Sequence, residues 1–205
     1  MRIMTEARFF KETFARLFVL AIQNKANFFS FTNSLAASAF LEKIEKGRYD
    51  DYFNKPLTDL FYDVTGNRIH EDKSYGVYND AYWCGHCYFE LFLRTRKPFA
   101  YLFLKLPLEK LMDLYPIYHE MDFSSLLEFF EKREKEKTIL RLLCEQKKTT
   151  LPRLSEATGI AVPTLSKYKV SDKALYRASF QMILAIADYF EVPVNLFREN
   201  VPETL

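Results

Sequence analysis

The hydrophobic and polar residues of the chain follow a helical period over most of its length. Between residues 5 and 29, apolar side chains recur three and four positions apart, which is the spacing of one buried face of an α-helix. These side chains belong to Ala7, Phe10, Phe14, Leu17, Phe18, Ala21 and Ile22. The same criterion predicts helices over residues 35–46, 81–95, 108–115 and 122–147, so the expected fold class is mainly all-α.

Polar residues, glycine and proline mark where these helices begin and end. Asn33 and Ser34 precede the second helix and can accept hydrogen bonds from its first amides. Gly47 follows that helix and suits a left-handed turn. Pro56 is typical of the first turn of a further helix, because its missing amide hydrogen is not needed there. Asp122 can cap the last of the helices named above.

Two stretches have no clear period. Residues 65–80 contain two glycine turn signals, at Gly66 and Gly76, and are the least regular part of the chain. Residues 99–104 are an apolar run between two prolines, and periodicity alone assigns this run neither to a helix nor to a strand.

Residues 131–137 are charged at every position. Such a segment is typical of a solvated helix that joins two packed units. We therefore predict an aromatic-rich N-terminal helical domain in residues 1–130 and a second domain in residues 131–205.

Composition supports a packed helical core. Of the 205 residues, 20 are Phe and 13 are Tyr, and aromatic rings of this number are expected to fill the core. The net charge of +2 argues neither for nor against a nucleic-acid partner, so the distribution of charge has to be considered instead. Three cysteines, an odd number, do not form a disulfide framework.

The chain shows no membrane or export signal. It has no run of 18 apolar residues, so no transmembrane helix and no membrane partner are expected. Residues 1–14 contain scattered charges and no small-residue cleavage site, which is unlike a signal peptide. The expected location is the cytoplasm.

Residues 154–168, with the sequence LSEATGIAVPTLSKY, carry the most informative pattern. It is the pattern of two helices that meet at a corner, with Gly159 supplying the left-handed turn that ends the first helix. The side chains expected to face the core are Leu154, Ala157, Ile160, Leu165 and Tyr168. The outer side of the second helix is left to Pro163, Thr164, Ser166, Lys167 and Lys169.

The flanking residues extend this pattern. Apolar positions before and after it are Ile139, Leu142, Leu143, Phe180, Ile183, Leu184, Ile186 and Ala187. Over about 60 residues, from Thr138 to Asn200, the chain resembles the Cro/C1-type (XRE-like) helix-turn-helix family. In that five-helix fold a short last helix seals the core with a Leu-Phe pair, which Leu196 and Phe197 match. The resemblance implies binding to double-stranded DNA.

Three features depart from the family pattern. Ala161 stands where the family usually has a Ser or Thr that caps the recognition helix. Pro163 lies in the first turn of that helix, where proline is tolerated. The link from Lys169 to Phe180 is a few residues longer than usual. These departures affect base recognition rather than the fold.

The local charge agrees with a DNA-binding role. Between Gln146 and Arg177 there are seven basic and two acidic residues, a net charge of +5 in a chain whose total is +2. The resemblance implies that residues 163–169 enter the major groove, whereas the preceding helix crosses the phosphate backbone. The predicted base contacts are Pro163, Thr164, Ser166 and Lys167. The predicted phosphate contacts are Lys147, Lys148, Thr150, Arg153, Lys169, Lys173 and Arg177.

Residues 83–87, WCGHC, resemble the active-site string of protein disulfide isomerases. Thiol chemistry of that kind needs a preceding buried strand, a βαβ setting and a facing cis-proline. The sequence predicts none of these, since neither Pro107 nor Pro116 has the required spacing. We interpret Trp83, Cys84 and Cys87 as apolar side chains on an aromatic helix, and predict no enzyme activity.

A zinc site is the alternative for the cysteine pair. The further candidate ligands are His70, His86, His119 and Cys144, but no second paired motif follows. Neither a metal nor a cofactor is predicted, and no phosphate-binding loop or nucleophile elbow is present.

Three hypotheses for function follow. The first is a sequence-specific DNA-binding regulator, for example a repressor of a phage or mobile element, that acts as a homodimer. The second is a protein-directed effector in which residues 1–130 bind a protein partner, since some phage anti-CRISPR inhibitors have a similar helix-turn-helix. The third is a redox enzyme that uses Cys84 and Cys87.

Overall fold

The computed structural model is all-α, as predicted, with about 74% of its residues in helices. It describes residues 2–48, 52, 54–69 and 78–200, and for residues 2–8 the backbone alone. The predicted turn at Gly76, the side chain of Ala7 and the candidate ligand His70 lie outside the described residues.

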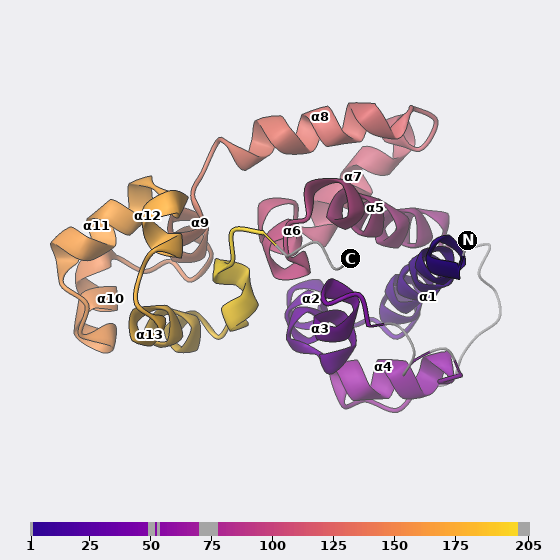
Figure 1. The fold of residues 1–205 in the computed structure, drawn as a ribbon, viewed down its shortest axis with the longest axis horizontal. Coiled ribbons are helices and arrows are strands. Elements are labelled where there is room, and N and C mark those ends of the chain that lie inside the picture. Colours follow the sequence, from indigo (N-terminus) through magenta and orange to yellow (C-terminus); the bar gives the residue numbers. More distant parts are fainter. Residues whose placement is uncertain (1, 49–51, 53, 70–77, 201–205) are drawn as a thin grey trace.

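Figure 1 shows the order and arrangement of the helices. The first seven are α1 (Arg2–Gln23), α2 (Phe28–Ala37), α3 (Ala39–Glu45), α4 (Leu57–Thr65), α5 (Asn79–Thr95), α6 (Phe99–Lys105) and α7 (Leu108–Tyr118). The remaining helices are α8 (Phe123–Glu134), α9 (Ile139–Gln146), α10 (Leu151–Thr158), α11 (Val162–Val170), α12 (Asp172–Tyr176), α13 (Phe180–Phe190) and the 3-10 helix η3 (Val194–Phe197).

The boundaries near the N-terminus differ from the prediction. The helix expected over residues 5–29 ends at Gln23, and α2 begins at Phe28 behind a cap in which Asn27 accepts a hydrogen bond from the Ser30 amide, at 2.9 Å. Asn33 and Ser34 therefore lie inside α2, so their prediction as caps is wrong.

The next boundary is set by a serine that the sequence analysis did not select. Ser38 ends α2, and its side chain accepts from the Leu41 amide to start α3. The prediction that Gly47 ends this part of the chain is confirmed, because Gly47 adopts a φ of 66° and donates to the Ile44 carbonyl at 2.9 Å. Pro56 immediately precedes α4.

The helices that carry the aromatic residues pack against one another as predicted. The ring of Phe14 on α1 lies 4.9 Å from that of Phe99 on α6, and the ring of Phe18 lies 5.5 Å from that of Tyr88 on α5. Phe92 stacks on Phe99 at 4.6 Å. The apolar run at residues 99–104, left open by periodicity, is thus the buried helix α6.

The single helix predicted over residues 122–147 is wrong. Asp122 does cap α8, accepting from the Ser124 amide at 2.8 Å, but α8 ends at Glu134 and α9 begins at Ile139. Lys105, the last residue of α6, contributes to the interruption between α8 and α9. Its ammonium group donates to the carbonyls of Glu134 and Lys137. These carbonyls are removed from the helical hydrogen-bond pattern, so the charged segment is held against the protein.

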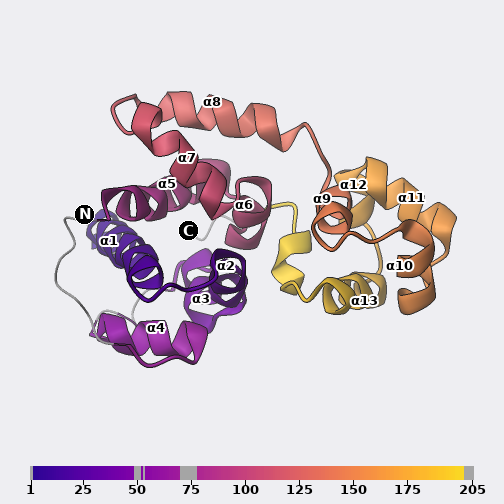
Figure 2. The ribbon, with the colours of Figure 1, turned by 180° about the vertical axis from the view of Figure 1, so that it is seen from behind.

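Seen from either side, the helices form two groups; α8 lies above the group that contains α5, α6 and α7, and the chain then descends to α9 (Figures 1 and 2). Helices α1–α7 form one group, whereas α9–α13 and η3 form the other. A single cluster of buried apolar side chains extends through both groups, and α6 contacts both α9 and η3. The division into domains at residue 130 stays a prediction.

Within residues 2–48, 54–69 and 78–200, no helix combines the length and the hydrophobicity that crossing a membrane requires.

Candidate nucleic-acid interface

Helices α10 and α11 are joined by a turn of the predicted kind. Gly159 ends α10 with a φ of 70°, and its amide donates to the Ser155 carbonyl at 2.8 Å. Ile160 then turns inward and is buried. The sequence forms this corner because glycine adopts the left-handed conformation without a steric cost, and isoleucine anchors the chain that follows.

The buried sides of the two helices agree with the prediction in all positions but one. Leu154 on α10 and both Leu165 and Tyr168 on α11 are buried. The Tyr168 hydroxyl lies 3.4 Å from the sulfur of Met182 on α13. Ala157 is exposed, so the expectation that it faces the core is wrong; Leu154 alone supplies the fully buried side chain of α10.

The end of this group of helices also follows the prediction. Leu196 and Phe197 on η3 are buried, and Ile183, Ile186 and Ala187 form the buried side of α13. Phe190 is buried as well, whereas two apolar positions of the predicted pattern, Phe180 and Leu184, are exposed. Phe180 is 69% exposed and Leu184 is 39% exposed.

The first turn of α11 lacks a side-chain cap. Ala161 occupies the cap position with φ −58° and ψ 139°, and the Leu165 amide bonds to its carbonyl at 3.1 Å. Pro163 lies within the first two helical positions, where an amide hydrogen is not needed. The extra residues between Lys169 and Phe180 form α12, which Ser171 caps by accepting from the Ala174 amide at 3.2 Å.

The outer face of α11 opens onto a shallow depression. Its walls combine residues of α11, α12 and the loop that follows, and they bring together three predicted base contacts and two predicted phosphate contacts. The lining residues are Pro163, Thr164, Lys167, Tyr168, Ser171, Lys173, Ala174 and Arg177. Ser166, a further predicted base contact, is exposed on α11 outside this lining.

The basic residues of this surface are free of acidic partners. Among the side chains that the structure describes, no carboxylate pairs with Lys148, Arg153, Lys167, Lys169, Lys173 or Arg177. The two acidic residues between Gln146 and Arg177 do little to reduce the positive charge of this surface. Asp172 lies 3.4 Å from the Lys105 ammonium, which neutralises it, and Glu156 is exposed on α10.

Five of the seven predicted phosphate contacts do not line the depression: Lys147, Lys148, Thr150, Arg153 and Lys169. Lys169 lines a separate hollow beside α9, together with Arg141, Cys144 and Thr149. Thr150 stands at the cap position of α10 without a side-chain cap bond. Thr150 precedes the start of α10 and Lys169 lies in the last turn of α11, so neither is at the turn around Gly159.

Lys147 has a different environment from the other predicted phosphate contacts. Its ammonium lies 3.4 Å from the Glu191 carboxylate and 4.6 Å from the ring centre of Tyr189, whose carbonyl it also contacts. These partners are the last turn of α13 and the residue that ends it, so the geometry holds Lys147 against that helix and away from α11.

The sequence analysis missed the junction that holds this group of helices in place. Asp172 accepts from the Ile139 amide at 2.7 Å and pairs with Lys105, while the Thr138 hydroxyl donates to the Lys169 carbonyl at 2.6 Å. A buried lysine in an otherwise apolar run, such as Lys105 after residues 99–104, was the available signal.

The WCGHC string lies inside α5 rather than at its start. Cys84 and Cys87 are buried, and burial raises the pKa of both thiols above the ordinary value. A reactive thiol has the opposite shift. Gly85 faces α1, where a Cβ atom would collide with the Cα atom of Ala15 and lie 3.1 Å from its nitrogen.

The candidate zinc ligands do not gather. In the described part of the chain, no group of three or more His, Cys, Asp or Glu side chains is placed to hold a metal ion.

Comparisons with protein-family models, with curated proteins and with solved structures find no match for this chain.

Proposed function

We propose that the protein is a sequence-specific DNA-binding regulator that uses α11 as its recognition helix. The observation that carries the proposal is the group of unpaired basic side chains on and around a short exposed helix. Lysine and arginine side chains that lack carboxylate partners are available to replace the counterions of the phosphate backbone. Elsewhere in the chain many basic residues are engaged, for example Lys11 with Glu90 and Lys137 with Glu145.

The two helices of the corner suit different parts of the duplex. Thr164, Ser166 and Lys167 project from α11, and hydroxyl and ammonium groups of this kind hydrogen-bond to base edges in the major groove. Arg153 on α10, with Lys173 and Arg177 beside α12, is assigned to the flanking phosphates. Lys147 is not part of this assignment because Glu191 holds it.

The experiment that tests this function is selection of binding sites from random duplex DNA, followed by anisotropy titrations at several salt concentrations. We expect an enriched sequence bound at least about 10³-fold more tightly than unrelated DNA, with an affinity that falls steeply with salt. An enriched inverted repeat would support the homodimer. No enrichment, together with no salt-dependent binding, would refute the proposal.

Variants separate the two kinds of contact. Lys167→Ala is expected to weaken binding to the selected site by about tenfold and to relax base preference at one position, since a base contact contributes about 1–3 kcal/mol. Arg153→Ala is expected to weaken binding to all sequences alike and to lower the salt slope by about one. The matched control is Lys132→Ala, which removes an exposed lysine from α8. Equal binding by Lys167→Ala, Arg153→Ala and the control would contradict the assignment.

A further inference from the structure

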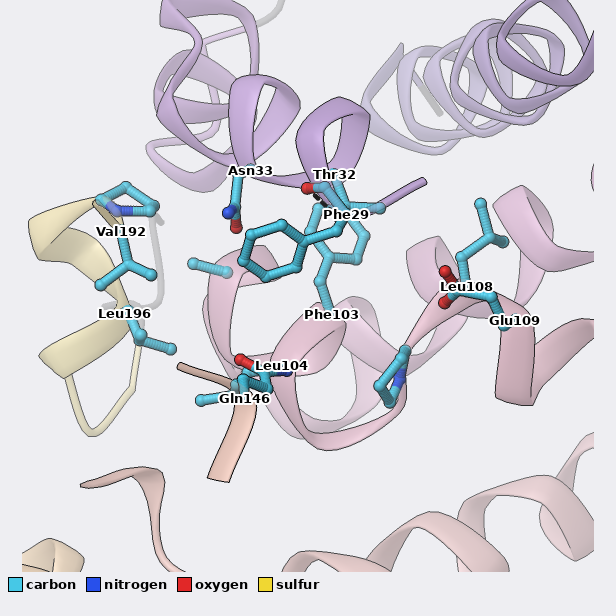
Figure 3. A pocket seen from close by; sticks show the side chains of 13 residues that line it. Phe29, Thr32, Asn33, Phe103, Leu104, Leu108, Glu109, Gln146, Val192 and Leu196 are labelled. Atoms are coloured by element: carbon cyan, nitrogen blue, oxygen red, sulfur yellow. Dashed lines mark hydrogen bonds between the residues drawn. The ribbon is translucent and has the colours of Figure 1, made fainter. Parts of the chain in front are cut away.

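A cavity of about 190 Å³ lies between the two groups of helices, where α2, α6 and the start of α7 meet α9 and η3. Figure 3 shows the side chains that surround it, with Val192 and Leu196 on one side and Leu108 and Glu109 on the opposite side. The complete lining is Phe29, Thr32, Asn33, Ala100, Phe103, Leu104, Pro107, Leu108, Glu109, Gln146, Val192, Pro193 and Leu196.

The lining has the composition of a site for a small ligand. Nine of the thirteen lining residues are apolar, including Phe29 and Phe103, although polar and apolar groups contribute almost equally to its exposed surface; Phe29 remains 50% exposed. Within the described chain, the amides of Asn33 and Gln146 and the carboxylate of Glu109 have no ion-pair partner and no side-chain hydrogen bond. An apolar cavity with a few convergent polar groups is the usual form of a small-molecule site.

The charge of the lining determines which ligand it fits. Glu109 is the only ionisable side chain among the described residues that line the cavity. The neighbouring hollow, which shares Phe29 and Asn33 with it, contains Lys147, but that ammonium is held by Glu191. A cation is therefore attracted and an anion is not. The faces of the phenylalanine rings favour a cation as well.

We infer that this cavity binds a small organic cation, a primary ammonium group attached to a body of about one ring. The ammonium pairs with Glu109, the apolar body packs between Phe29, Phe103 and Leu196, and the amides of Asn33 and Gln146 accept or donate at its edge. The size agrees, because a cavity of roughly 150 Å³ accommodates one benzene molecule. The site is independent of the DNA-binding surface on α11.

The first test is a calorimetric titration of the full chain with three probes of one shape and different charge: benzylammonium, benzyl alcohol and benzoate. Saturable binding of benzylammonium is expected, with affinity for benzyl alcohol at least about fivefold weaker, as for loss of a partly exposed ion pair. Absence of saturable benzylammonium binding would overturn the proposal, as would equal or tighter binding of either other probe. The titration contains no DNA, so its outcome does not depend on the proposed function.

Two variants locate the binding. Glu109→Gln is expected to reduce benzylammonium affinity by about fivefold and to abolish the preference over benzyl alcohol. The control Glu128→Gln changes an exposed glutamate on α8 and should bind all probes as the unmodified chain does. Asn33→Trp places a ring in the cavity and should prevent binding. Unchanged binding by Glu109→Gln would overturn the site, whether or not Asn33→Trp folds.

Discussion

At the scale of single residues, Gly85 shows why a short string can resemble an active site without its setting. The glycine lies between two buried cysteines at the place where α5 approaches the backbone of α1 at Ala15. Its missing side chain allows the two helices to pack closely. The spacing Cys-Gly-His-Cys in this chain is accounted for by helix packing, because Cys84 and Cys87 are also part of the aromatic core.

The first prediction concerns this contact. Gly85→Ala should lower the free energy of unfolding by about 2 kcal/mol, since the added methyl group meets backbone atoms that cannot move aside without shifting α1. Urea denaturation followed by circular dichroism measures the change. Glu128→Ala, an exposed change on α8, should alter stability by less than about 0.5 kcal/mol. Similar values for the two variants would contradict the packing role.

Glu45 is a buried carboxyl group at the junction of α3, α6 and η3. It accepts a hydrogen bond from the Phe99 amide at 2.9 Å, and burial raises its pKa above the ordinary value of 4.5, although Phe99, Arg198 and Asn195 oppose the shift. The side-chain oxygen of Asn195 is buried without a partner among the described residues. A neutral side chain with a hydrogen-bond donor at position 45 can therefore bond to the Asn195 oxygen and stabilise this junction.

The second prediction gives the pH dependence of Glu45. Below about pH 4.5 the carboxyl is protonated in both the folded and the unfolded chain. Because the unfolded chain ionises Glu45 near pH 4.5 and the folded chain only at a higher pH, stability falls between pH 4.5 and the folded-state pKa, so Glu45 opposes folding at neutral pH. Glu45→Gln should raise the free energy of unfolding by about 1 kcal/mol at pH 7 and change it little at pH 4. A variant less stable than the original chain at pH 7 would exclude this explanation.

At the scale of helices, the sequence predicted the interiors better than the ends. The apolar periods of α1, α5 and α11 identified helices correctly because a buried stripe has to recur every three to four residues. The ends depend on one capping residue each, and several residues in a row were eligible. Asn27 and Ser38 form the caps where Asn33 and Ser34 were selected, because only the former adopt extended backbone angles.

The third prediction uses the uncapped start of α11. Ala161 already has backbone angles close to those of Ser179, which caps α13. Ala161→Ser should therefore raise the free energy of unfolding by about 1 kcal/mol. Thermal unfolding measures it. The same substitution at the exposed Ala157, inside the last turn of α10, should give no gain. Equal effects of Ala161→Ser and Ala157→Ser would show that the missing cap at the start of α11 does not limit stability.

At the scale of the whole molecule, the two groups of helices are joined through buried polar contacts that no sequence period reveals. Lys105 and Asp172 are 67 residues apart, and the lysine side chain is only 1% exposed. Periodicity identifies which face of a helix is buried but not which distant helix covers it. The corner at Gly159 was predictable because all its determinants are local, whereas the placement of Lys147 against Glu191 depends on the fold.

The fourth prediction concerns this junction. Lys105→Met should lower the free energy of unfolding by about 3 kcal/mol, because it leaves the carbonyls of Glu134 and Lys137 and the Asp172 carboxylate without their donor. The value is at the low end for a buried pair because Asp172 is 20% exposed. Urea denaturation gives the change in stability. The control Lys110→Met removes an exposed ammonium, and a loss as small as the control's would contradict the role of Lys105.

The position of η3 has a consequence for synthesis of the chain. The buried residues Leu196 and Phe197 belong to η3, which contacts α6 of the first group and follows every described α-helix in the sequence. On the ribosome, the part of α6 that η3 covers stays exposed to water until residues 194–197 have emerged. The aromatic helices can collapse earlier, but their final packing waits for η3, so a product that stops before residue 194 would expose an apolar surface to chaperones and proteases.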